Sequence, residues 1–144
     1  MVSERNSDEG KKLFKEKNYD EAMKKYRMNI NITEGLEKKK YSEEELKEID
    51  QINYKGKQNF LRCFIKIKDH DEPTIETAWK FVNQLFDKEQ TQLHYFLKSK
   101  IMIQRKYVSD GLELAKEMVN KFPNEEAKVA LEGIKKQVAK IKSS

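Results

Sequence analysis

Apolar residues recur at intervals of three and four along most of the chain. One segment carries Tyr19, Ala22, Met23, Tyr26 and Ile30, a spacing that places their side chains on one face of an α-helix. Comparable stripes predict seven helices, over about residues 4–17, 19–36, 42–68, 73–86, 91–104, 108–121 and 123–142. We therefore predict an all-α fold in a single domain that spans residues 1–144.

Local signals mark several helix boundaries. Ser42 is followed three residues later by Glu45, the pattern of a capping box at a helix N-terminus. Pro73 suits the first position of a helix, because its missing N–H has no helical partner there. Gly56 lies inside the third expected helix, where glycine costs about 1 kcal/mol relative to alanine. That helix therefore either bends at Gly56 or bears this cost.

Hydrophobic residues make up 37% of the chain and charged residues 38%, which favours amphipathic helices with one solvated face. No apolar stretch is long enough for a transmembrane helix, and the highly charged N-terminal segment excludes a secretory signal. Cys63 is the single cysteine, and its apolar neighbours favour a buried core residue over a reactive thiol. One cysteine allows no disulfide within the chain, which fits a reducing compartment, the cytoplasm or alternatively the nucleus.

Residues 9–26 resemble a tetratricopeptide repeat (TPR), a pair of antiparallel helices. The resemblance implies that Gly10 lets the two helices approach each other and that Tyr19 packs at the turn between them. It also implies that Ala22 is small where the second helix crosses the first, and that Tyr26 fills the gap to the next repeat.

Two further segments resemble later repeats. The second would combine residues 60–69 and 73–86, and the third would span residues 93–123, with Gly111 and Ala115 at its close helix crossing. The resemblance thus implies an α-solenoid of three repeats, at about residues 4–38, 42–88 and 91–122, with a C-terminal capping helix at 123–142.

The order of these parts is similar to the TPR domain of large immunophilins and related co-chaperones, in which an insertion, here residues 34–57, separates the first two repeats. This resemblance implies an adaptor that catalyses nothing and binds a peptide or helix of a partner protein. It also implies a clamp of Lys, Asn and Arg side chains around the acidic tail of a heat-shock chaperone.

Four of the five clamp positions are changed in this sequence. Asn59 matches one of them, whereas Ser7 and Lys11 stand in place of a Lys and an Asn, and the Lys and Arg of the third repeat fall near Gln92 and Phe96. Charge-assisted contacts of this kind are worth about 1.5–3 kcal/mol each. We therefore expect standard chaperone-tail binding to be weak.

A concave groove lined by the first helix of each repeat would still be rich in basic and aromatic side chains. The candidate residues for this partner-binding groove are Lys11, Lys15, Lys55, Asn59, Arg62, Lys66, Phe96 and Ser99. We hypothesise that the groove takes an acidic and hydrophobic peptide or helix of a partner protein. A plain solvated face that binds nothing is an equally good interpretation of these lysines.

No pattern in the sequence indicates catalysis, a metal site or a cofactor. His70 stands in an acidic turn, but the spacing of His, Cys and carboxylates does not suit zinc, and no glycine-rich phosphate loop is present. The alternative to a protein-interaction module is a basic helical-repeat RNA binder, which rests on the net charge of +5 and on the lysine-rich C-terminal segment. An enzyme is the least favoured class.

Overall fold

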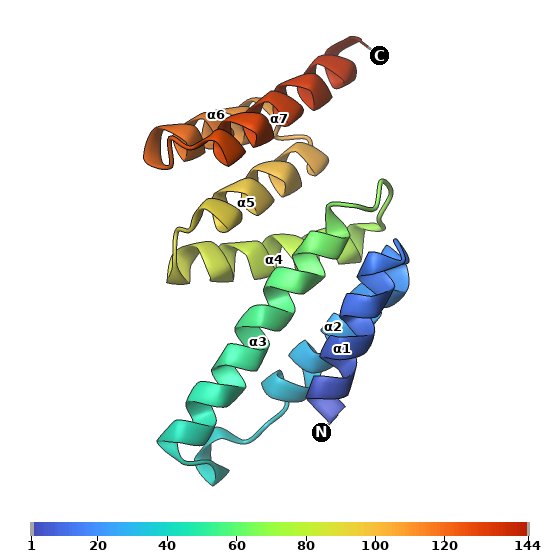
Figure 1. Ribbon diagram of the computed structural model, residues 1–144, viewed down its shortest axis with the longest axis vertical. Coiled ribbons are helices and arrows are strands. Elements are labelled where there is room, and N and C mark those ends of the chain that lie inside the picture. The colour runs from blue at the N-terminus through green and yellow to red at the C-terminus, as the bar shows by residue number, and fades with distance from the viewer. Residues whose placement is uncertain (1, 144) are drawn as a thin grey trace. The chain divides into compact units, whose positions relative to one another are not determined.

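The computed structural model describes residues 2–143, and this part of the chain folds into seven α-helices with no β-strand (Figure 1). The predicted all-α class is thus confirmed. The helices are α1 (Val2–Lys15), α2 (Tyr19–Glu34), α3 (Glu43–Phe64), α4 (Glu72–Lys88), α5 (Gln92–Gln104), α6 (Val108–Lys121) and α7 (Glu125–Ser143), and the short 3₁₀ helix η1 (Lys38–Lys40) precedes α3.

The chain divides into two compact units, with the boundary between Asp69 and His70. Unit 1 contains α1, α2 and α3, and unit 2 contains α4 to α7. The boundary falls inside residues 42–88, the span expected to form the second repeat, so the two helices of that expected repeat belong to different units.

Unit 1 is built on a close approach of its helices. In Figure 1, α1 and α3 run in the same direction and α2 runs against both. A Cβ atom added at Gly10 of α1 would lie 2.7 Å from Cζ of Tyr26 on α2. Ala22 and Tyr26 are both buried. The close contact expected at Gly10 is therefore present.

Helix α3 passes through Gly56 without a break. A Cβ atom at this position would lie 3.2 Å from Cγ1 of Ile30, so the glycine allows α3 to pack closely against α2. The helix ends at Phe64, before the expected end at Lys68. The amide of Ile67 donates to the carbonyl of Phe64, a tighter i→i+3 bond that is typical of a final turn.

The helix caps follow the sequence signals closely. The Glu45 amide donates to Ser42 Oγ at 3.2 Å and the Ser42 amide donates to Glu45 Oε1 at 3.0 Å, which confirms the predicted capping box. Asp71 caps α4 by accepting from the Thr74 amide at 2.9 Å. Since α4 begins at Glu72, Pro73 occupies its second position and not the expected first.

The turns of the α1–α2 and α5–α6 hairpins share one geometry. Lys17 and Lys106 both have positive φ, 63° and 72°. In the first turn, the Asn18 amide donates to the Leu13 carbonyl, and in the second, the amide of residue 107 donates to the carbonyl of residue 102. Both bonds are those of a Schellman motif, which closes a helix with a left-handed residue.

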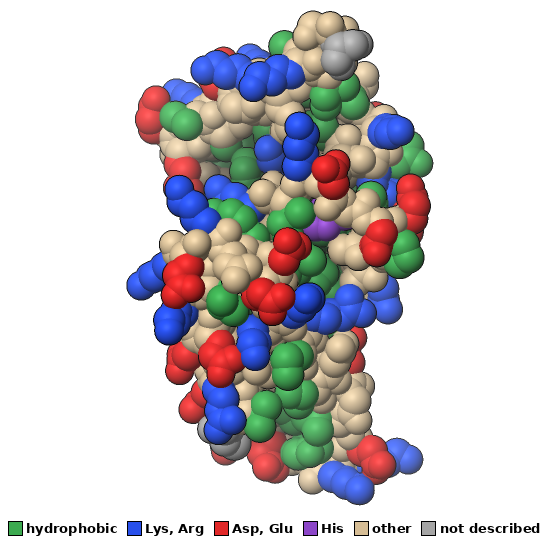
Figure 2. Space-filling view, turned by 90° about the vertical axis from the view of Figure 1, so that its right-hand side faces the viewer, with side chains coloured by type: hydrophobic (Ala, Val, Ile, Leu, Met, Phe, Trp, Pro, Cys, Tyr) green, Lys and Arg blue, Asp and Glu red, His purple; other side chains and the backbone are tan. Residues whose placement is uncertain are grey.

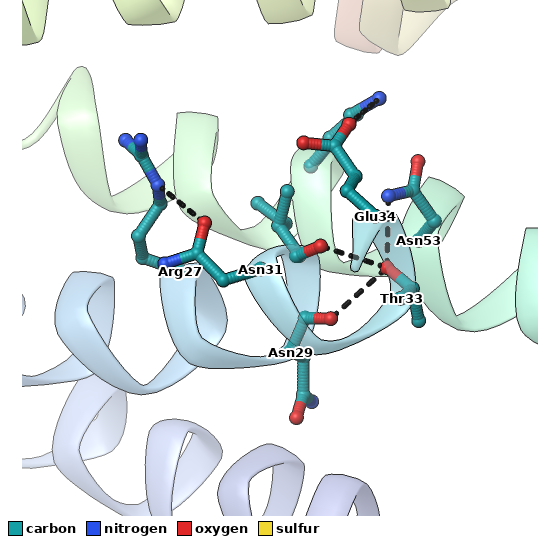
Figure 3. A network of polar contacts seen from close by, with 8 residues as sticks. Arg27, Asn29, Asn31, Thr33, Glu34 and Asn53 are labelled. Carbon is teal, nitrogen blue, oxygen red and sulfur yellow. Dashed lines mark hydrogen bonds and ion pairs between the residues drawn. The ribbon is translucent and has the colours of Figure 1, made fainter. Parts of the chain in front are cut away.

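A layer of buried polar side chains joins the three helices of unit 1. Asn6 Nδ2 of α1 donates to Asn29 Oδ1 of α2 at 3.1 Å, and Asn29 Nδ2 donates to the Ser3 carbonyl at 2.9 Å. One turn further along α2, Nδ2 of the half-buried Asn53 on α3 donates to Thr33 Oγ1 at 2.9 Å (Figure 3). Because buried polar groups are costly when unpaired, these bonds favour one rotation of each helix.

Unit 2 packs its helices in chain order, each against the next. One part of its core joins Ile103, Ala115, Ile134 and Val138. A second part joins Tyr95, Met118 and Ala127. Two apolar residues of α7, Val129 and Ile141, are exposed at the surface.

Candidate functional site

Two adjoining hollows open between α1 and α3 of unit 1. Residues of both helices line each hollow, and Tyr26 of α2 and Asn59 of α3 belong to both linings. The hollow near the C-terminal ends of α1 and α3 has a volume of about 290 Å³. The hollow near their N-terminal ends has a volume of about 240 Å³. Together they form a groove along the two parallel helices.

The first of these, named here the basic hollow, is lined by three cations and no carboxylate. Lys11 and Lys15 come from α1, and Arg62 comes from α3. Phe14 and Tyr26 supply the aromatic part of its lining. Four residues that the sequence assigned to a partner-binding groove are therefore brought together here, namely Lys11, Lys15, Asn59 and Arg62.

Arg62 fixes the orientation of Asn59. The guanidinium Nη1 of Arg62 donates to Asn59 Oδ1 at 3.0 Å. An amide side chain has two N–H donors besides its oxygen, so this bond leaves the donors of Asn59 for a ligand in either hollow. The arrangement presents cationic groups and an amide beside an aromatic surface.

Tyr26 is almost fully buried and supports the groove from below. The pKa of its phenol is raised to about 12, first by burial and second by the nearby Cys63, whereas Arg62 acts in the opposite direction. Burial alone raises the pKa of the Cys63 thiol to about 12. Cys63 is fully buried, as expected for a core residue, and a neutral thiol of this kind is a poor nucleophile.

The second hollow, named here the mixed hollow, carries charges of both signs. Glu4 of α1 and Glu48 of α3 line it together with Lys55, which the sequence had placed in the groove. The sequence interpretation did not include the two glutamates. The signal that could have identified them is their heptad spacing, since Glu4 precedes Lys11 by seven residues and Glu48 precedes Lys55 by seven.

Three of the expected groove residues do not join these hollows. Lys66 is exposed in the segment after α3 and lines neither of them. Phe96 and Ser99 belong to unit 2. Ser99 is fully buried and its Oγ donates to the Tyr95 carbonyl at 2.7 Å, so it cannot line an open groove as expected. Phe96 packs against both parts of the unit 2 core.

Basic side chains of unit 2 are engaged with aromatic rings. Lys98 Nζ lies 4.4 Å from the ring centre of Phe86, and the guanidinium of Arg105 lies 4.7 Å from that of Trp79. Arg105 also pairs with Glu76 at 3.0 Å. These contacts hold α4 against α5 and the turn that follows α5, and they engage Lys98 and Arg105 within the unit.

Among residues 2–143, no group of three or more His, Cys, Asp or Glu side chains is arranged to hold a metal ion. No helix in this part of the chain is both long enough and apolar enough to cross a membrane. No model of a known protein family matches the sequence, and no curated protein matches it significantly.

Proposed function

We propose that this protein is a TPR-type interaction module that binds an acidic and hydrophobic segment of a partner protein in the groove of unit 1. The observation that carries the proposal is the basic hollow. Its lining combines Lys11, Lys15 and Arg62 with Phe14 and Tyr26, and it contains no carboxylate. A carboxylate next to an apolar side chain complements such a surface in both charge and hydrophobicity.

The size of the groove supports a peptide ligand. Pockets for small molecules usually measure about 300–1,000 Å³, and the basic hollow of about 290 Å³ lies at the lower limit of that range. It would accommodate a few side chains of a longer segment. Since Lys11, Lys15 and Arg62 are exposed, each contact with a carboxylate is screened by water and contributes about 0.2–1 kcal/mol.

The charge distribution favours a protein partner over RNA. A phosphate backbone that continued from the basic hollow into the mixed hollow would meet Glu4 and Glu48. On the face shown in Figure 2, basic and acidic side chains are interspersed and form no continuous basic field. RNA binding of the electrostatic kind needs such a field along the backbone.

The two hairpins support the TPR-type assignment. The α1–α2 and α5–α6 turns share their left-handed lysine and their hydrogen bonds. Each hairpin also has a glycine at its helix crossing, Gly10 in unit 1 and Gly111 in unit 2. Of the clamp residues expected for chaperone tails, the sequence keeps only Asn59, which lines both hollows. A different acidic ligand is therefore the better candidate.

The proposal is tested by fluorescence anisotropy with a labelled peptide that alternates Glu with Leu and Phe. We expect binding that weakens about tenfold on Arg62→Glu, because the substitution replaces an attraction with a repulsion. The matched control is Lys47→Glu, since Lys47 is an exposed residue of α3 that lines neither hollow. Equal affinities of the two variants, or tighter binding of a labelled single-stranded RNA than of the peptide, would contradict the proposal.

A further inference from the structure

We infer that the groove of unit 1 selects a bipolar segment, with acidic residues over the basic hollow and a basic residue over the mixed hollow. The inference rests on the proposed function and adds the chemistry and the alignment of the ligand. It assigns to Glu48 the recognition of an ammonium or guanidinium group of the partner.

The charges change sign in the same order along both walls of the groove. On α3, Glu48, Lys55 and Arg62 follow each other at intervals of seven residues and all line the hollows. On α1, Glu4 is followed seven residues later by Lys11. A spacing of seven residues keeps side chains on one face of a helix. The acidic end of α1 therefore lies beside the acidic end of α3.

The direction of the two helices contributes to this order at the ends of the groove. The N-terminal end of a helix favours anionic side chains and the C-terminal end favours cationic ones, because the backbone dipoles add along the axis. Glu4 lies in the first turn of α1, Lys15 in its last turn, and Arg62 in the last turn of α3. In an antiparallel pair these preferences would oppose each other across the groove. Since α1 and α3 are parallel (Figure 1), the charge preferences of their neighbouring ends reinforce each other.

The order of charges also sets a spacing for the ligand. Glu4 precedes Lys11 and Lys15 by two to three helical turns, which corresponds to about 10–17 Å at a rise of 1.5 Å per residue. An extended peptide covers this distance with about three to five residues, at roughly 3.3 Å each. The ligand is thus an extended segment whose acidic and basic side chains are separated by that number of residues.

Uniformly charged ligands fit this groove less well than bipolar ones. An acidic peptide that fills both hollows places carboxylates beside Glu48 and Glu4 in the mixed hollow, which also contains Lys55. A basic peptide places its cations beside Lys11, Lys15 and Arg62. Like charges at close range oppose binding. Specificity for the bipolar segment therefore arises from repulsion of the wrong ligand as well as from attraction of the right one.

Three labelled peptides of equal length test the inference by fluorescence anisotropy at low ionic strength. The first carries two Glu residues, an apolar spacer of four residues and two Arg residues. The second has the same residues in reverse order, and in the third the two Arg residues are replaced by Glu. We expect the better of the two bipolar peptides to bind about three- to tenfold more tightly than the acidic one, as exposed charge contacts allow.

The decisive variant is Glu48→Lys, and its matched control is Asp50→Lys, since Asp50 is an exposed residue of α3 outside both hollows. We expect Glu48→Lys to remove the preference for the bipolar peptide and to strengthen binding of the acidic one, and Asp50→Lys to change neither. An unchanged preference in Glu48→Lys would overturn the inference. The proposed function would still stand if Arg62→Glu weakened the binding of the acidic peptide, and it would fail with the inference if no peptide bound.

Discussion

Replacing Gly111 by alanine would introduce a methyl group where α6 crosses α5. The new Cβ atom would lie 2.8 Å from Cγ1 of Ile103 and 2.9 Å from the carbonyl oxygen of Ser99. Carbon atoms are at their optimal separation at about 3.5–4.0 Å. The Ile103 side chain could rotate, but the Ser99 oxygen belongs to the backbone of α5, so the two helices would have to move apart.

The size of the effect follows from two opposing contributions. Overpacking of a close contact costs about 1–3 kcal/mol. The cost at Gly111 lies at the upper end of this range, because the contact with the Ser99 oxygen is to backbone. The higher helix propensity of alanine stabilises α6 by about 1 kcal/mol. We therefore expect Gly111→Ala to lower the free energy of unfolding of unit 2 by about 2 kcal/mol. For a unit of this size, 1 kcal/mol corresponds to roughly 4–8 °C in the melting temperature.

The same unit offers a matched control for this prediction. A Cβ atom added at Gly133 of α7 meets no atom within 4 Å, so Gly133→Ala adds helix propensity without a clash. We expect this variant to be more stable than the parent by about 1 kcal/mol. Thermal unfolding of both variants, followed by far-ultraviolet circular dichroism, measures the difference. A Gly111→Ala protein as stable as the Gly133→Ala protein would refute the close crossing of α5 and α6.

Two further predictions concern buried groups of unit 1. Asn29→Ala should lower its stability by about 1–3 kcal/mol, because it removes the acceptor of the Asn6 side chain. The control is Asn31→Ala, at an exposed residue of the same helix, which should change urea-induced unfolding little. Equal losses of stability in Asn29→Ala and Asn31→Ala would contradict the prediction. The stability that the neutral Cys63 thiol provides should be complete below pH 9.0, its ordinary pKa, and should decline as the pH rises toward about 12, because the unfolded thiol ionises first. Cys63→Ala should weaken this alkaline decline in urea titrations at increasing pH, although Tyr26 contributes to it in the same direction. An identical decline in the two proteins would count against the buried neutral thiol.

Some of the groove was accessible to reasoning from the sequence. The resemblance to helical repeats assigned Lys55, Asn59 and Arg62 of α3 to the groove, together with Lys11 and Lys15 of α1. Residues three, four or seven apart lie on one face of a helix. These relations depend only on the geometry of a single helix, which local sequence fixes. The same reasoning failed for Ser99, because the sequence does not show how far α5 is rotated relative to its neighbours.

The sequence by itself determined the helices, their caps and the small residues at their crossings. Ser42 and Glu45 form their capping box, and Gly10 and Ala22 lie where the helices approach, because such features involve residues within one helix or one hairpin. The tertiary structure alone decided which side chains meet across helices. It placed Glu4 and Glu48 in one hollow, and Lys11 and Arg62 in the other. These outcomes depend on the relative rotation and direction of helices far apart in the chain, and no local pattern encodes them.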